Sequence, residues 1–379
     1  MQREGLFGNC LPVCLHIKKQ EQLSPSDLVF EDLVTTVKCH PSESLIASGL
    51  INGEVYLHSY SCSEESKQIH KFTHHKKSCR AMGFTDDGRR LYSVSKDKSI
   101  FCVDVHTGKL KRKIKKAHES PIYSVVVTGD TFIATGDDDG LLKVWDMRTK
   151  EATMEMKECE DFISDMIVED NKKIVIAASG EGTLTSFNIR RRRVELQSEL
   201  FDSELLCLAR MKGGGKLVCG TSEGVLNIFN WGQWGNISDR FPCGQDQVDS
   251  LVPITDNVVC AGTSDGNIQA VHVLPNRVLG LVGQHMEDFP VESLTLTSDL
   301  SCVASCSHDQ KVKFWNIEEL KSQTVDTSKR GTKQAKKNKV KFGKAKQNDF
   351  FSGLVDSAPG SGDTGADDNS DDDSDDDSD

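Results

Sequence analysis

The sequence predicts an all-β protein built from seven similar four-stranded sheets, and three observations support this fold class. First, a turn residue followed by a short alternating strand recurs along the chain, at Asn52, Asp97, Asp139, Glu181, Glu223, Asp265 and Asp309. Second, the intervals between these residues fall between 42 and 45 positions, the period of a four-stranded propeller blade. Third, one such sheet cannot bury both of its faces, whereas seven packed around an axis can. We therefore expect a seven-bladed β-propeller.

The segment 120–150 illustrates one unit. Its residues favour strands in PIYSVVV, TFIATG and LLKVWDM, which are separated by the turns TGD and DDDG. Gly140 ends the second turn, where a tight hairpin needs a residue that tolerates positive φ. The fourth, outer strand of each unit is expected to follow the third.

The last unit contains only three strand segments, VESLTLT, SCVASC and KVKFWNI, before the sequence turns basic after Leu320. The segment 26–32, SDLVFED, precedes the first unit and has no partner there. We predict that Leu28, Val29 and Phe30 supply the missing outer strand and so close the ring, because an unpaired sheet edge invites aggregation.

Two units carry the same set of polar residues. The sets are His118, Thr135, Asp139 and Trp145 in the third unit, and His285, Ser305, Asp309 and Trp315 in the seventh. In these residues the chain resembles the WD-repeat propeller family, in which such a set forms a buried hydrogen-bond chain from histidine through aspartate and hydroxyl to the indole. The resemblance implies a structural rather than a catalytic role. Units two, four, five and six have Val103, Phe187, Phe229 and Val271 at the tryptophan position, so we expect their networks to be incomplete.

Three segments are more specific than the repeat itself: FNIRRRR at 187–193, LPNRV at 274–278 and NDFF at 348–351. They resemble the WD repeat-containing protein 55 family, and the similarity runs from about Leu28 to Leu354. That resemblance implies a nucleolar protein tied to ribosomal RNA processing. It also implies pre-ribosomal assembly proteins as partners, and the nucleolus, the nucleus and the cytoplasm as locations.

The sequence contains no Gly-rich phosphate loop, nucleophile elbow or HExxH motif. We therefore expect a non-catalytic interaction scaffold without a cofactor or a small-molecule substrate. No apolar run reaches the ~18 residues of a membrane-spanning helix, so no membrane contact is expected. Cys10, Cys14 and His16 lack further ligands nearby, and no metal site is expected from them.

We divide the chain into a disordered N-terminal segment (1–26), the propeller (27–320) and a disordered tail (321–379). The tail is first basic, with ten Lys or Arg and one acid in 321–346, and then acidic, with ten Asp and no base in 362–379. Blocks of like charge repel and stay solvated. The basic block is either a solubilising linker or a nuclear or nucleolar targeting segment with weak phosphate contact.

The tail also holds four candidate sites. Phe350 and Phe351 form an aromatic pair within charged sequence, which is typical of a docking motif. Ser370 and Ser374 precede acidic triplets and suit an acid-directed kinase, whose phosphates would add negative charge.

The net charge of −12 argues against a broadly basic nucleic-acid-binding face. Two local exceptions are the segment 109–116 and the run Arg190, Arg191, Arg192 and Arg193. Both follow third strands, where basic residues either protect an outer edge or contact RNA weakly. Trp231 and Trp234 form a conspicuous loop, in which an indole packs inward or anchors a partner.

An alternative function rests on the motif WDMR at 145–148. It resembles the W-D-x-R box through which some WD-repeat proteins bind the propeller adaptor of a cullin-type ubiquitin ligase. The resemblance implies a substrate receptor in which Arg148 carries the contact. The other interpretation is an ordinary arginine at a strand end, because four-residue motifs often occur by chance.

Overall fold

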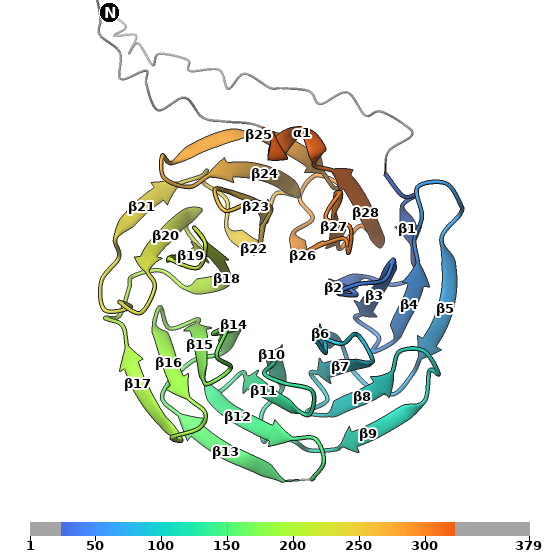
Figure 1. Cartoon of the computed structure of the whole chain (residues 1–379), viewed down its shortest axis with the longest axis horizontal. Coiled ribbons are helices and arrows are strands. Elements are labelled where there is room, and N and C mark those ends of the chain that lie inside the picture. The colour runs from blue at the N-terminus through green and yellow to red at the C-terminus, as the bar shows by residue number, and fades with distance from the viewer. Residues whose placement is uncertain (1–23, 150, 323–379) are drawn as a thin grey trace, which may run out of the picture. The chain divides into compact units, whose positions relative to one another are not determined.

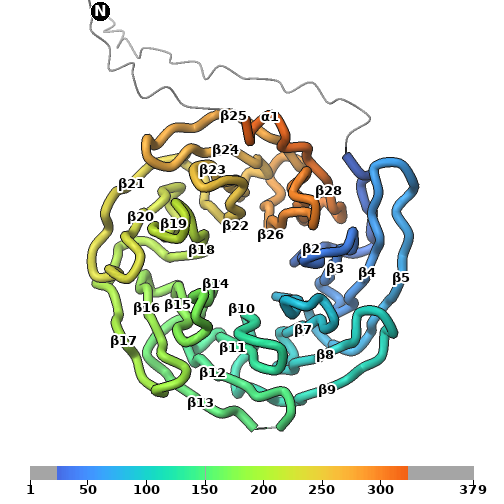
Figure 2. Tube along the Cα trace, viewed as in Figure 1, coloured from blue at the N-terminus to red at the C-terminus, as the bar shows by residue number. Residues whose placement is uncertain are grey.

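The computed structural model describes residues 24–149 and 151–322. Seven four-stranded antiparallel sheets stand around a central axis, each running from an inner to an outer strand (Figure 1). The trace passes from the outer strand of one blade to the inner strand of the next (Figure 2). The predicted seven-bladed, all-β propeller is confirmed.

The strands of the blades follow chain order. Blade one has β2 (Val34–Cys39), β3 (Leu45–Leu50), β4 (Val55–Ser59) and β5 (Lys67–Phe72), and blade two has β6 (Cys79–Phe84), β7 (Arg90–Ser95), β8 (Ile100–Asp104) and β9 (Leu110–Ile114). Blade three has β10 (Ile122–Val127), β11 (Phe132–Asp137), β12 (Leu141–Asp146) and β13 (Ala152–Lys157), and blade four has β14 (Ile163–Val168), β15 (Ile174–Ser179), β16 (Leu184–Asn188) and β17 (Arg193–Gln197). Blade five has β18 (Leu205–Met211), β19 (Lys216–Thr221), β20 (Val225–Asn230) and β21 (Asp239–Pro242), and blade six has β22 (Val248–Pro253), β23 (Val258–Thr263), β24 (Asn267–His272) and β25 (Arg277–Gln284). Blade seven has β26 (Val291–Leu296), β27 (Cys302–Ser307) and β28 (Lys311–Asn316), to which β1 (Leu28–Val29) is added.

Every inner strand has a register shift after its first residue, as between Ile122 and Ser124 in β10. A bulge of this kind re-aims the side chain of the extra residue. The second residues of all seven inner strands line the central cavity, which has a volume of about 600 Å³. This ring is Thr35, Arg80, Tyr123, Ser164, Leu206, Asp249 and Glu292.

Polar side chains near the start of the inner strands join neighbouring blades. Each donates a hydrogen bond to the carbonyl of the first residue in the next inner strand. The pairs are Thr35 to Cys79 (2.5 Å), Ser124 to Ile163 (2.7 Å), Ser164 to Leu205 (2.6 Å), Cys207 to Val248 (3.3 Å) and Ser250 to Val291 (2.8 Å). Such bonds contribute about 1 kcal/mol each, and they fix the spacing of the blades around the axis.

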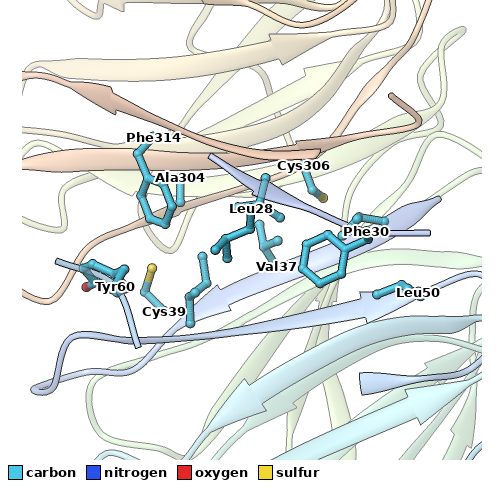
Figure 3. Packing of buried hydrophobic residues seen from close by; sticks show 12 residues of the cluster. Leu28, Phe30, Val37, Cys39, Leu50, Tyr60, Ala304, Cys306 and Phe314 are labelled. Carbon is cyan, nitrogen blue, oxygen red and sulfur yellow. The ribbon is translucent and has the colours of Figure 1, made fainter. Parts of the chain in front are cut away.

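The ring is closed by the N-terminal strand, as predicted. In β1, Leu28 pairs with Val312 and Val29 with Lys311 of β28, and the Phe30 amide donates to the Gln310 carbonyl at 2.9 Å. Leu28 and Phe30 are buried in a cluster shared by blades one and seven (Figure 3). The other buried members of the cluster are Val34, Val37, Cys39, Ile46, Leu50, Tyr60, Ala304, Cys306, Val312 and Phe314.

The chain after β28 forms one short helix, α1 (Glu318–Lys321), which the sequence did not predict. Its Leu320 and the preceding Ile317 are buried in a cluster that includes Leu279 and Val282 of β25. The helix therefore covers the side of blade six by burial of apolar residues, although it has only four residues.

Removal of β1 is expected to open the ring. A chain that begins at Thr35 loses the burial of Leu28, Phe30 and Val34, about 2 kcal/mol each, and exposes the edge of β28. We expect the free energy of unfolding to fall by roughly 4–7 kcal/mol and aggregation to increase. Chemical unfolding and light scattering measure both, and a chain that begins at Pro25 is the control. A monomeric Thr35 chain with an unchanged melting temperature would contradict the closure.

Candidate functional site

Blade three contains a complete buried hydrogen-bond chain. The Trp145 Nε1–H donates to the Thr135 Oγ1 at 2.9 Å, and this oxygen lies 2.7 Å from His118 Nε2. The His118 Nδ1 lies 2.8 Å from the Asp137 carboxylate. All four side chains are buried. Because the Asp137 carboxylate only accepts, His118 Nδ1–H donates to it, and the Thr135 hydroxyl donates to His118 Nε2. Burial raises the pKa of Asp137, but the hydrogen bonds from His118 and the backbone outweigh this and lower it.

The acid of this chain is Asp137, and the prediction of Asp139 was wrong. Asp139 instead accepts a hydrogen bond from the Ser120 hydroxyl in the exposed turn. Residues 135 and 137 point to the same face of β11 because side chains alternate along a strand. The second oxygen of Asp137 also accepts from the amides of Asp139 and Leu141, at 3.1 and 2.9 Å, and thereby holds the turn.

Blade seven forms the chain with the turn acid. Trp315 Nε1–H donates to Ser305 at 2.8 Å, Ser305 lies 2.7 Å from His285 Nε2, and His285 Nδ1 lies 2.9 Å from Asp309. Blade two has no tryptophan. There His75 lies 2.8 Å from the Ser93 hydroxyl and 2.9 Å from the Ser99 hydroxyl.

Blades five and one fill the space at the tryptophan position differently. In blade five, Phe229 occupies the tryptophan position opposite Leu217, and its ring centroid lies 5.8 Å from that of Phe201. In blade one, His58 stands opposite Ile46 at the corresponding place, which the sequence pattern did not reveal. Its Nδ1 and the Ser48 hydroxyl are buried without a hydrogen-bond partner in the described chain, and burial lowers the pKa of His58. The networks hold blade geometry beneath the surface, so partner contacts belong to the rims and the channel.

The channel mouth brings together charged residues from blades two, three and seven. Arg80 pairs with Asp138, and its guanidinium carbon lies 5.0 Å from the Tyr123 ring centroid. In blade seven, Glu292 pairs with His308 at 2.9 Å, which raises the pKa of His308. The sequence pattern did not reveal Arg80, Tyr123 and Glu292, because only the bulge after the first inner-strand residue turns them into the cavity.

Asp249 is the least satisfied carboxylate of the mouth. One oxygen accepts from the Gln247 amide at 2.7 Å, while the buried Oδ2 has no hydrogen-bond partner within the described part of the chain. Burial, and then the neighbouring carboxylate of Glu292, raise the pKa of Asp249 to about 7. Deeper along the wall, burial raises the pKa of Asp165 to about 6, against hydrogen bonds from the amides of Leu208 and Met166.

Arg148, the candidate contact of the WDMR motif, lies at the rim just after β12. Its guanidinium forms two hydrogen bonds with the Asp146 carboxylate, at 2.9 and 2.6 Å. It also lies 5.5 Å from the Phe132 ring centroid. These contacts hold the Arg148 side chain in one orientation. The side chain is also 66% exposed, so it remains accessible.

The arginine run occupies the exposed turn from β16 to β17. The Asn188 side chain accepts from the amides of Arg190 and Arg191, at 3.1 and 2.8 Å, and Arg192 has a positive φ of 53°. Arg193 begins β17 and pairs with Glu195 at 2.8 Å. The other basic segment, 109–116, contains β9, the outer strand of blade two.

Trp231 and Trp234 have different roles. Trp234 is buried in the cluster with Phe229 and Leu217, so it is the indole that packs inward, and its burial excludes it as a partner-binding candidate. Trp231 is half-buried and donates to Glu169 at 3.3 Å, and the Arg210 guanidinium lies 4.2 Å from its ring centroid. The two indoles meet edge to face with their ring centroids 5.1 Å apart, so the half-buried Trp231 ring packs directly on the core.

Phe350, Phe351, Ser370 and Ser374 lie outside the described residues, as do Cys10, Cys14 and His16. Within residues 24–149 and 151–322, no cluster of His, Cys, Asp and Glu could hold a metal ion. In the same ranges, no helix has the length and apolar character needed to cross a membrane.

The blade-three network can be tested by Thr135→Val. The substitution keeps the shape but leaves two buried groups, His118 Nε2 and the Trp145 N–H, without their partner. We expect the free energy of unfolding to fall by about 2–5 kcal/mol in urea titrations. Thr128→Val in the same blade is the matched control, because its buried hydroxyl has no partner in the described chain and its loss should cost little. Equal effects of the two changes would contradict the network.

Comparison with known proteins agrees with this architecture. A sequence model of the WDR55 family matches residues 25–320. WD repeat-containing protein 55 of Bos taurus is 44% identical over 333 residues, 87% of both chains, and the Homo sapiens protein of that name is 41% identical over the same shares. The homolog from Drosophila melanogaster is 38% identical over 352 residues, 92% of this chain and 70% of the fly protein. The chain therefore belongs to the WDR55 family of WD-repeat β-propeller proteins.

Proposed function

We propose that this protein is a non-catalytic interaction scaffold in nucleolar ribosome biogenesis and supports ribosomal RNA processing. The observation that carries the proposal is the WDR55 family match over residues 25–320, the whole length of the propeller. The resemblance to a nucleolar family tied to ribosomal RNA processing supplies the cellular role. Its partners are assembly proteins of pre-ribosomal particles, in the nucleolus and nucleus and also in the cytoplasm.

The construction of the propeller supports a scaffold. The blades are joined by inner-strand hydrogen bonds, and β1 closes the ring, so the loops on both rims project from a rigid frame. Rim loops on such a frame can hold several partners at once. RNA contact is the weaker part of the proposal. Arg190 and Arg192 are exposed, but Glu195 lies 2.8 Å from Arg193 and partly neutralises the run.

Depletion of the protein tests the proposal. We expect pulse-labelled precursors of ribosomal RNA to accumulate and mature species to fall, and re-expression of the full chain to restore them. Affinity purification from nuclear extract with and without ribonuclease identifies the contacts, since those that persist after ribonuclease are made to protein. Normal precursor maturation in depleted cells would exclude the role.

A second candidate function is that of a substrate receptor for a cullin-type ubiquitin ligase. The specific observation in its favour is Arg148, whose guanidinium is both exposed and fixed by Asp146. A side chain that is already oriented loses little rotamer freedom on binding.

This candidate predicts that Arg148→Ala abolishes co-purification of the propeller adaptor without loss of folding. Arg193→Ala is the matched control, because Arg193 is also exposed and also pairs with an acid at a rim. We expect a decrease of roughly tenfold or more for Arg148→Ala and none for the control, since an interface arginine of this kind often carries most of the contact energy. Retained adaptor binding by Arg148→Ala would reject the site.

A further inference from the structure

The two rims of the propeller differ in their connections. In an antiparallel blade, the turn between the second and third strands lies at the same end as the connection to the next blade. On this rim we define the acidic sector as four blade-connecting loops, residues 158–162, 198–204, 243–247 and 285–290. These loops hold nine Asp or Glu residues and no Lys or Arg. The loops 73–78 and 115–121 on the same rim contain four Lys and a single Glu.

The carboxylates of the acidic sector lack internal counter-charges. None of the nine forms an ion pair with a Lys, Arg or His side chain anywhere in residues 24–149 and 151–322. Acids elsewhere on the propeller do pair, such as Asp146 with Arg148 and Glu195 with Arg193. The sector therefore presents one sign of charge, which attracts cations.

The four loops form one continuous surface, because backbone hydrogen bonds tie each loop to a neighbouring β-turn. The bonds run from Gly180 N to Phe162 O (2.9 Å), Phe201 N to Gly182 O (3.0 Å), Ser222 N to Glu204 O (3.2 Å), Cys243 N to Gly224 O (2.9 Å), Ser264 N to Gln247 O (3.0 Å) and His285 N to Gly266 O (2.9 Å). The three linking turns, 180–183, 222–224 and 264–266, each carry an acid and no Lys or Arg.

Apolar side chains project from the same surface. Leu200 is 70% exposed and Met286 is 62% exposed, among the most exposed large apolar residues of the described chain. The residue after Leu200, Phe201, packs against Phe229 inside blade five and so holds the loop in place. Exposed apolar residues rimmed by charge are typical of a protein-binding surface.

The inner end of the sector meets the channel mouth at Asp249. Its buried Oδ2 has no hydrogen-bond partner in the described chain, although it lies on the wall of the cavity. Burial raises the pKa of Asp249 most, and the carboxylates of Glu292 and Asp265 raise it further, against the Gln247 hydrogen bond and His308. Asp249 therefore experiences the negative field of these two acids. A cation bound nearby would reduce that field.

We propose that the acidic sector is a docking surface for a Lys- and Arg-rich polypeptide segment of a partner protein, with an apolar side chain of the segment packed on Leu200. Charge complementarity selects a cationic occupant and repels the phosphates of RNA. The apolar contact selects a polypeptide over a simple polyamine. The inference goes beyond the proposed function, which does not say which rim binds, and its test does not depend on ribosomal RNA.

The test uses the full chain and a labelled synthetic peptide of alternating Lys and Arg residues with one central leucine, measured by fluorescence anisotropy. The sector variant is Glu199→Lys, Asp202→Lys and Glu204→Lys together. The control variant is Glu65→Lys, Glu151→Lys and Glu319→Lys, which changes the net charge equally with exposed acids outside the sector. A third variant, Leu200→Ser, keeps every charge.

We expect the sector variant to bind the peptide roughly tenfold or more weakly, with a smaller dependence on salt, and the control to bind within about twofold of the wild type. Leu200→Ser should weaken binding roughly threefold or more, and only for the peptide that carries leucine. Equal losses in the sector and control variants, or no binding to the wild-type chain, would overturn the proposal. The proposal would also be overturned if a single-stranded RNA of equal length bound more tightly than the peptide and the sector substitutions weakened that RNA binding.

Discussion

The pairing of β1 with β28 is the constraint on which the rest of the propeller depends. Six blades are each made from a continuous stretch of chain, and only the seventh needs a strand from the opposite end of the fold. Two paired residues, Leu28 and Val29, and the Phe30 amide give that sheet its fourth strand. The burial of Leu28 and Phe30 against blades one and seven stabilises this short pairing and joins the two blades. The channel, the rims and the inner-strand bonds exist in their observed form because the ring is closed.

The blades solve one packing problem with different chemistry. Blades three and seven bury a tryptophan, a hydroxyl, a histidine and an acid as a satisfied chain. Blade five fills the same space with buried Phe229 and partly buried Phe201, which need no hydrogen bonds there. A partly polar solution is the costly one, because a buried group without a partner loses its hydration and gains nothing. The Ser48 hydroxyl and His58 Nδ1 of blade one are in this position.

Much of the fold could be predicted because the repeat period and the alternation of apolar residues are local signals. The role of Leu28 could be predicted too, since an unpartnered strand at one end matched a missing strand at the other. Asp137 could not be chosen over Asp139 from the sequence, because three consecutive acids follow Gly136. Only the folded backbone determines which of them lies within hydrogen-bond distance of His118. The helix α1 forms through contacts of Leu320 and Ile317, which four residues of sequence do not reveal. The mouth ring with Asp249 and Glu292 depends on bulges that shift the register of the inner strands.

The order of synthesis determines when the closing strand β1 can pair. Leu28 is synthesised early, whereas its partner Val312 emerges only after all the intervening blades. The first strand must therefore stay unpaired, or be shielded, throughout most of translation. Loop closure over such a separation is slow in folding terms. Completion of the ring thus comes late in the synthesis of the propeller, and the rims reach their final spacing only when the two ends of the propeller meet.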